Sequence, residues 1–327
     1  PDGVEWRALG APRVRQQVKR LAQYFRARRP AVVLASGFNE GLACVVASWL
    51  VRRPPRIVVR VHIVASVHLS DQKSRFDRRF HRHVMAWAFR PPVRILAASN
   101  DAARDFERLL GYPDGAVATL HDPVLDDLPK ITTGWSHPWV EANNLTLVLA
   151  AGVLIPRKGF ATLIRAFSLL QPRKPAIRLL VAGEGAQRHE LQALIDELGL
   201  SDSVTLAGFV PNQDLPYGHA DLFVCSSVYE GLGNVIIESL AAGCPVVSTD
   251  CPFGPAEILE EGRYGQLVPV GDPAAMAAAM ERALSAPVDR EALRLRARDF
   301  HIDQVWPAFV DLVGIDAEAA RPSSSSE

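Results

Sequence analysis

The sequence predicts two doubly wound α/β domains with parallel sheets, and three observations support this fold class. The chain has 327 residues, enough for two domains of about 100–200 residues each. Apolar runs of strand length alternate with amphipathic segments of helix length, as in parallel α/β sheets. The alternation stops between His121 and Asn144, in a polar stretch with prolines that is typical of a linker. We therefore expect an N-terminal domain at 1–140, a C-terminal domain at 141–315 and a disordered tail at 316–327.

The first half predicts four strands and three helices. The strands are expected at Ala31–Ser36, Ile57–His62, Ile95–Ala98 and Ala116–Leu120. The helices are expected near Leu42–Val51, Asp77–Phe89 and Asp101–Leu110.

The second half repeats the alternation and ends in helices. Its strands are expected at Thr146–Ala151, Ile177–Ala182, Val204–Ala207, Leu222–Cys225 and Pro245–Thr249. Its helices are expected at Phe160–Leu170, Gln187–Leu198, Gly233–Ala242, Pro273–Ser285, Asp289–Phe300 and near Trp306–Val313. Ligands of such sheets bind beyond the carboxyl ends of the strands, so the loops at that edge are the place to look for a site.

The composition indicates a globular protein of the cytoplasm. No apolar run approaches the ~18–20 residues that span a bilayer. The four cysteines form no CxxC pair and no histidine stands beside them at ligand spacing, so we expect buried thiols and no zinc site. Charge is uneven: residues 1–145 hold 22 Lys and Arg against 13 Asp and Glu, whereas residues 146–327 hold 14 against 23. This asymmetry suggests different partners for the two halves, although chance scatter in an arginine-rich chain is the alternative.

The loop after the strand Thr146–Ala151 carries two adjacent cations. Arg157 and Lys158 stand directly before an expected helix. A helix N-terminus presents unpaired N–H groups and partial positive charge, so this loop is a candidate seat for a diphosphate. An ordinary solvated surface pair is the alternative.

The loop after the strand Leu222–Cys225 reads SSVYEGLGNVIIESL and carries Glu230, Gly231, Gly233 and Glu238. The glycines allow the backbone to approach a ligand, and the N–H groups of residues 231–235 can face phosphate oxygens. Ionised carboxylates would repel phosphate but accept strongly from hydroxyls, which points to sugar and ribose hydroxyls. The alternative is that Glu230 caps the helix and Glu238 faces solvent.

Several stretches together resemble a known family. GVLIPRKGFATLIRAF, LLVAGEGAQRHELQALIDELGL, VTLAGFV and YEGLGNVIIESLAAGCPVVSTDCPFGPAEIL, followed by GRYGQLVPVGD, are similar to the nucleotide-sugar domain of the retaining GT-B glycosyltransferases of family GT4. Glu230 and Glu238, with seven residues between them, match the two-glutamate motif of that family. The resemblance covers residues 145–315 densely and the first half loosely. It implies a GT-B fold, in which two Rossmann-like domains face a cleft.

The resemblance also implies roles for particular residues. Glu230 would hold hydroxyls of the transferred sugar and Glu238 those of the ribose. Lys158 would neutralise the diphosphate, assisted by backbone N–H groups of a short glycine-rich run. That run consists of Gly231, Leu232, Gly233 and Asn234. Three further donor-binding residues near the nucleobase would be Gly183, Glu184 and Val210.

His62 ends an expected strand where the family often places a histidine near the anomeric carbon, although a structural histidine is the alternative. The implied reaction is transfer of a sugar, with retained configuration, from a nucleoside diphosphate donor such as a UDP-sugar to a hydroxyl. The leaving phosphate accepts the acceptor's proton, so neither a second catalytic carboxylate nor a cofactor is expected. No metal is expected either. The sequence has no Asp-x-Asp motif, and Asp105-Phe106-Glu107 falls on the expected surface of a helix.

The sequence departs from the family at two places. Many relatives have an arginine where this chain has Val153, and Arg157 can replace that arginine only if its loop turns it inward. The chain opens Pro1-Asp2-Gly3, which resembles the segment after the family's first strand and glycine-rich loop. We therefore expect an N-terminal domain without that strand and loop.

Three other functions compete with sugar transfer. An NAD-dependent oxidoreductase would use Gly183-Glu184-Gly185, but Arg188 stands where the third glycine of that fingerprint belongs. A nucleotide-sugar epimerase has the same fold and would release product sugar without an acceptor. A catalytically inactive nucleotide-sugar-binding subunit would account for Val153 and the short start.

The acceptor is expected to be a sugar or a lipid-linked glycan of cell-surface polysaccharide synthesis, and no nucleic acid is expected as a partner. The segment KSRFDRRFHRHVMAWAFR predicts a basic amphipathic helix with Phe76, Phe80, Val84 and Trp87 on one side. Such a helix suits peripheral contact with an anionic membrane at its inner face, or binding of a lipid diphosphate. A helix that packs this apolar side into the core and leaves its arginines in solvent is the alternative.

Overall fold

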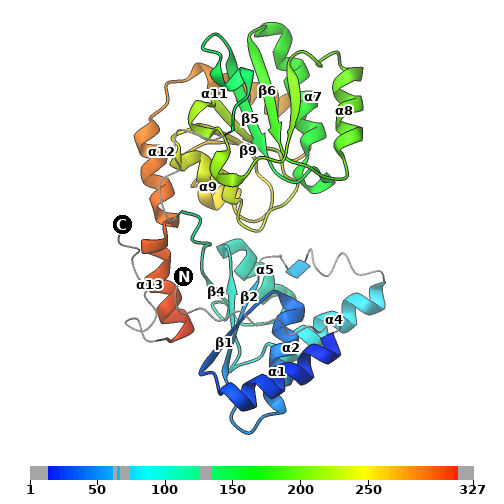
Figure 1. The fold of residues 1–327 in the computed structure, drawn as a ribbon, viewed down its shortest axis with the longest axis vertical. Coiled ribbons are helices and arrows are strands. Elements are labelled where there is room, and N and C mark those ends of the chain that lie inside the picture. The colour runs from blue at the N-terminus through cyan, green and yellow to red at the C-terminus, as the bar shows by residue number, and fades with distance from the viewer. Residues whose placement is uncertain (1–13, 62–64, 67–73, 126–134, 316–327) are drawn as a thin grey trace. The chain divides into compact units, whose positions relative to one another are not determined.

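The computed structural model describes residues 14–61, 65–66, 74–125 and 135–315. The chain divides into two compact units, residues 1–121 with 305–327 and residues 122–304, and each contains one sheet (Figure 1). Every strand pair in both sheets is parallel, which confirms the predicted α/β class. Within the described ranges, no helix has the length and apolarity needed to cross a membrane.

The first unit is built on a four-stranded sheet of order β1-β2-β3-β4. The strands are β1 (Val32–Ser36), β2 (Arg56–Val61), β3 (Arg94–Ala97) and β4 (Ala118–Thr119). The helices are α1 (Val14–Arg28), α2 (Phe38–Trp49), α4 (Arg75–Ala88) and α5 (Asn100–Leu110). The helix α1 was not predicted, and β4 is shorter than the five residues expected.

Local sequence signals set the helix ends in this unit. The Ser99 hydroxyl accepts a hydrogen bond from the backbone N–H of Ala102 and so caps the start of α5. The same helix ends at Gly111, whose φ of 71° suits a glycine. Phe38 of α2 stacks on Phe106 of α5 with ring centroids 5.6 Å apart, so the two helices share one core.

The last helix, α13 (Ile302–Val313), completes the first unit although it ends the described chain. Val305 and Val313 are buried in one cluster with Val58 and other residues of the sheet. Arg56 and Arg94 donate to the carbonyl oxygens of Val313 and Leu312, at 3.0 Å and 2.9 Å, so basic side chains cap the end of α13.

These contacts explain where the units differ from the expected domains. The first unit ends at residue 121 and takes in residues 305–315, which the sequence placed with the C-terminal domain. The expected tail at 316–327 lies outside the described residues. The exact domain boundaries therefore stay a prediction.

The second unit is built on a six-stranded sheet of order β10-β9-β8-β5-β6-β7. The strands are β5 (Thr146–Ala151), β6 (Ile177–Ala182), β7 (Val204–Gly208), β8 (Leu222–Cys225), β9 (Val246–Thr249) and β10 (Gln266–Val268). The first strand, β5, is central. Strands β6 and β7 extend the sheet on one side of it, and β8 to β10 extend it on the other. The strand order therefore reverses between β5 and β8, which is where open α/β sheets bind ligands.

Helices of the second unit lie on both sides of its sheet (Figure 1). They are α6 (Pro138–Glu141), α7 (Phe160–Leu170), α8 (Arg188–Glu197), α9 (Asn234–Ala241), α10 (Pro255–Ile258), α11 (Pro273–Ser285) and α12 (Arg290–Ala297). Leu163 and Phe167 of α7 are fully buried against Leu179 of β6 and Met280 of α11. This packing fixes the central strands, and with them the loops that follow β5 and β8.

Candidate functional site

A buried carboxylate with two cationic partners lies at the carboxyl edge of the second sheet. Glu230 follows β8 and is only 5% exposed. Its Oε1 lies 2.5 Å from Nζ of Lys158, and its Oε2 lies 3.0 Å from a guanidinium nitrogen of Arg157. The Ser227 hydroxyl donates to Oε1 at 2.5 Å. Two positive charges thus face one negative charge, which leaves an excess of positive charge at the point where the strand order reverses.

Backbone contacts join the loop after β5 to the loop after β8. The Ser226 hydroxyl donates to the carbonyl oxygen of Lys158 at 2.8 Å. The N–H of Val228 donates to the carbonyl oxygen of Arg157 at 2.8 Å. Because each cation is anchored through its own backbone, the two loops hold Arg157 and Lys158 beside Glu230.

The residue after Lys158 must be a glycine for the loops to come this close. Gly159 has a φ of 63°, in the left-handed region. A Cβ at this position would lie 2.0 Å from the carbonyl oxygen of Ser226. Any side chain would therefore force the two loops apart.

Arg157 is turned toward the site, as its predicted role requires. Its guanidinium carbon lies 5.4 Å from the ring centre of Tyr229, a cation–π distance, and its side chain is 30% exposed. Val153, in contrast, is 54% exposed and carries no charge. The second cation of the site is thus supplied by residue 157.

The glycine-rich run leads into the start of α9. Gly233 has a φ of 102° and directly precedes α9, and Asn234 is the exposed first residue of that helix. Leu232 is buried, and its carbonyl oxygen would lie 1.8 Å from a Cβ on Gly254. The first N–H groups of a helix have no partner within it, so this end suits an anion.

Glu238 lies one turn farther along α9 and is held by two donors. The Tyr217 hydroxyl donates to Oε2 at 2.7 Å, and the side-chain amide of Asn212 donates to Oε1. Burial raises the pKa of Glu238, while the hydrogen bonds from Tyr217 and Asn212 act to lower it. Burial and the charge of Glu238 raise the pKa of Tyr217 well above its ordinary value, so the hydroxyl stays a donor.

Gly183, Glu184 and Val210 were predicted to lie near the nucleobase, and the structure links them to the site less clearly than it links the residues above. Gly183 packs so closely on the loop after β5 that a Cβ there would lie 1.9 Å from the carbonyl oxygen of Gly152. Glu184 pairs with Arg188 at 2.8 Å, and Val210 is buried. No described contact joins Glu184 or Val210 to Glu230 or Glu238, so their roles stay predictions.

Four residues of the site were not predicted from the sequence. Ser227 and Tyr229 lie within the quoted loop, and Asn212 and Tyr217 lie before β8. Asn212 and Tyr217 stand in no motif, and their contacts with Glu238 arise only through the fold.

Two expectations concern the first unit. His62 lies outside the described residues, so its role stays a prediction. The expected surface position of Asp105-Phe106-Glu107 is wrong, because Phe106 and Glu107 are buried and Glu107 accepts a hydrogen bond from the N–H of Val117 at 2.9 Å. Among the residues that the structure describes, no three His, Cys, Asp or Glu side chains are grouped to hold a metal ion.

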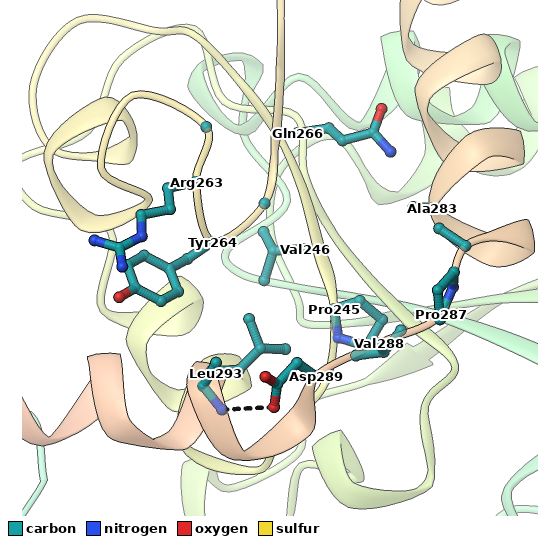
Figure 2. A pocket seen from close by; sticks show the side chains of 14 residues that line it. Pro245, Val246, Arg263, Tyr264, Gln266, Ala283, Pro287, Val288, Asp289 and Leu293 are labelled. Atoms are coloured by element: carbon teal, nitrogen blue, oxygen red, sulfur yellow. Dashed lines mark hydrogen bonds between the residues drawn. The ribbon is translucent and has the colours of Figure 1, made fainter.

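A separate pocket of about 460 Å³ lies at the opposite, amino edge of the sheet (Figure 2). Pro245 and Val246 at the start of β9 line it, together with Gln266, the first residue of β10. Asp289 on its floor already accepts the N–H of Ala292 at 3.0 Å and caps α12. None of the predicted site residues lines this pocket.

Comparison with known families covers both halves of the chain. Residues 135–300 match the family model described as Glycosyl transferases group 1. Residues 4–127 match the model described as Glycosyltransferase Family 4.

Curated relatives differ in how much they share with this chain. The lipopolysaccharide core biosynthesis glycosyltransferase LpsD of Rhizobium meliloti is 34% identical over 277 residues, which cover 75% of this chain and 78% of LpsD. A Campylobacter jejuni N-acetylgalactosaminyltransferase, named for an N-acetylgalactosamine-N,N'-diacetylbacillosaminyl-diphospho-undecaprenol acceptor, is 37% identical over 151 residues. That match covers 46% of this chain and 40% of the relative, so the chain spans less than half of the relative's length.

Solved structures share the fold. Anabaena HepE in complex with UDP superposes with a TM-score of 0.76 at 20% identity, over 91% of this chain and 81% of HepE. The lipopolysaccharide outer core galactosyltransferase WaaB has a TM-score of 0.73 at 17% identity, over 92% of this chain and 80% of WaaB. The predicted GT-B fold class is thereby confirmed.

Proposed function

Because the chain belongs to the glycosyl transferases group 1 family, we propose that it transfers a sugar from a nucleoside diphosphate donor to a hydroxyl acceptor. One observation carries the proposal: Arg157 and Lys158 converge on the buried Glu230 where the strand order of the second sheet reverses. This arrangement offers positive charge for a diphosphate and a carboxylate for neutral hydroxyls in one place.

The charge that develops on the leaving diphosphate is the main demand on the site. Lys158, Arg157 and the first N–H groups of α9 are fixed in place and would stabilise that charge without reorganising. The leaving phosphate would take the proton of the acceptor hydroxyl, and the sugar would keep its anomeric configuration. This chemistry needs no resident metal or cofactor.

Glu230 and Glu238 would each bind different hydroxyl groups of the donor. Glu230 lies beside the two cations, so it would accept from hydroxyls of the transferred sugar. Glu238 is oriented by Tyr217 and Asn212 and would accept from the ribose hydroxyls. A UDP-sugar is the proposed donor, in keeping with the UDP bound in the HepE structure.

The proposed acceptor is a lipid-linked glycan or a growing cell-surface polysaccharide. Support comes from the relatives, which are named for lipopolysaccharide core synthesis and for a diphospho-undecaprenol acceptor. His62 is proposed to lie near the anomeric centre. We place the protein in the cytoplasm.

Thermal unfolding with excess UDP, GDP, ADP or NAD tests the donor site. A nucleotide at ~100 times its Kd should stabilise the folded chain by roughly 2.7 kcal/mol, and we expect this with UDP. Glu238→Ala should abolish the shift. Arg157→Gln should weaken UDP binding and leave uridine binding unchanged, because uridine has no diphosphate. An equal shift with UDP in the wild type and Glu238→Ala would refute the ribose assignment.

Turnover experiments separate the competing reactions. NMR of the product reports whether the anomeric configuration is retained, and EDTA tests the independence from metal. Release of an altered sugar without an acceptor would show an epimerase instead. UDP binding without turnover on any acceptor would favour an inactive binding subunit.

A further inference from the structure

The apolar side of α4 is not the side that packs on the core. Phe80 and Trp87, seven residues apart and so on one helix face, are 58% and 56% exposed. The core contacts come from Met85 and Ala88, which are buried. The alternative in which the side with Phe80 and Trp87 packs into the core is therefore wrong, and a stripe of large apolar side chains faces solvent.

The end of α2 extends this stripe across a second helix. Trp49, the last residue of α2, is 52% exposed, and its ring lies 4.7 Å from that of Trp87 in an edge-to-face arrangement. Leu50, which follows it, is 51% exposed. We define the aromatic patch as Trp49, Leu50, Phe80 and Trp87. An apolar patch of this kind on a protein surface usually marks an interaction site.

Exposed arginines adjoin the aromatic patch. Arg26 donates to the carbonyl oxygen of Leu50 at 2.7 Å, which holds a guanidinium at the edge of the patch. The single acidic side chain of α4, Asp77, accepts from the Ser74 hydroxyl at the start of the helix. Arg52 and Arg53 follow Leu50 along the chain and are exposed, and Arg79 and Arg82 are exposed on α4, on the flank next to the side that carries Phe80 and Trp87.

We propose that the aromatic patch and its arginines form a docking surface for an anionic lipid bilayer. Tryptophan favours the boundary between lipid headgroups and acyl chains, and arginine binds lipid phosphates. The excess of basic residues in the first half of the chain complements a negatively charged leaflet. A helix that lies flat on a membrane needs this combination of exposed aromatic and basic side chains. The proposal stands on the first unit and does not depend on sugar transfer.

Flotation of the full chain with lipid vesicles tests the proposal. We expect binding to vesicles of phosphatidylcholine with 30% phosphatidylglycerol, little binding to phosphatidylcholine alone, and weaker binding in 0.5 M salt. Trp49→Ser with Trp87→Ser should lower the partition coefficient at least tenfold, and so should Arg79→Glu with Arg82→Glu. The matched control is Leu169→Ser with Arg165→Glu on α7, where both side chains are also exposed, and it should bind as the wild type does.

Circular dichroism and thermal unfolding should show that all these variants fold. Equal binding of the wild type and the Trp49→Ser, Trp87→Ser variant to phosphatidylglycerol vesicles would overturn the proposal. Absence of vesicle binding by the wild type would overturn it too. Binding to single-stranded RNA instead, lost in the same variants, would assign the patch to nucleic acid and refute the bilayer.

Discussion

The ammonium group of Lys158 lies 2.5 Å from Oε1 of Glu230, although 72 residues separate the two along the chain. The pair meets because β5 and β8 are neighbours in the sheet and the loops that follow them leave the same edge. Both side chains are nearly buried, at 13% and 6% exposure. The pair is therefore at once a structural contact and the centre of the proposed donor site.

Lys158→Met should destabilise the fold by up to about 3 kcal/mol, because it removes one partner of a buried carboxylate. Arg157 and Ser227 remain and limit the loss. In a Glu230→Gln background the same change should cost less than ~1 kcal/mol. Urea unfolding of the wild type, the two single variants and the double variant gives the coupling energy between Lys158 and Glu230. The control is Arg263→Met. The Arg263 side chain pairs with Glu260 but is 70% exposed, so this change should be nearly neutral. Additive losses from Lys158→Met and Glu230→Gln would contradict the prediction.

Nucleotide binding should weaken as the pH falls through the pKa of Glu238. Burial raises this pKa above its ordinary 4.5, so the carboxylate protonates, and becomes a poorer acceptor for ribose hydroxyls, at a higher pH than an exposed glutamate would. Tyr217→Phe removes a hydrogen bond that lowers the pKa, so its inflection should lie at a still higher pH. Calorimetric titration of UDP between pH 4.5 and 8 measures both. Identical inflections in the two proteins would show that Tyr217 does not act on Glu238.

The raised pKa of Glu238 also has a consequence for stability. A carboxyl whose folded pKa lies above its unfolded pKa favours folding while protonated. Its contribution is therefore complete below about pH 4.5 and is lost as the pH rises through the folded value. The Glu238→Gln variant should lack this part of the pH dependence when unfolding free energies are compared across that window.

Gly159→Ala should destabilise the chain and weaken UDP binding together, because the new methyl group would strike the carbonyl oxygen of Ser226. Gly199→Ala is the matched control: its φ of 66° is nearly the same, but no atom lies within 4 Å of the added Cβ. The control isolates the cost of the left-handed backbone, about 1–2 kcal/mol. Urea unfolding should show a larger loss for Gly159→Ala by at least ~1 kcal/mol. Equal losses of stability in the two variants would mean that the loop around Gly159 accommodates the methyl group without further destabilisation.

The cysteines should react slowly with iodoacetamide in the folded protein. Burial raises the pKa of Cys44 to about 11 and that of Cys244 and Cys251 to about 12. Burial and the charge of Glu230 also raise the pKa of Cys225. Because the thiolate is the reacting form, a rise from 9.0 to about 12 lowers its fraction about a thousandfold at pH 8. Mass spectrometry of samples labelled with and without urea measures the difference, and similar rates in both would contradict it.

The sequence predicted the buried elements best. Strands β5, β6 and β8 and helices α7 and α11 have the predicted bounds, because their apolar runs are buried and end at polar or turn residues. Helix α1 was missed because its arginines and glutamines interrupt the apolar period, and β10 has only three residues. Amphipathy predicted α4 but not which side of it packs, since that depends on Met85 and Ala88 meeting a neighbour.

The residues of the candidate site were likewise predicted only in part. Lys158, Glu230 and Glu238 stand in motifs and were predicted. The donors to Glu238 were not, because Asn212 and Tyr217 lie 26 and 21 residues before it and reach it only through the fold. Arg157 is turned inward and contacts Glu230 and the ring of Tyr229, and the spacing of the sequence predicts neither contact.

The position of α13 has a consequence for synthesis on the ribosome. The strands that the structure describes in the first unit have been translated by residue 121, yet Val305 and Val313, which pack with Val58 and Leu96, come about 180 residues later. At ~5–20 residues per second, this interval lasts roughly 10–40 s. The nascent first unit therefore exposes an apolar surface while the whole second unit is translated. During this period a chaperone could bind that surface.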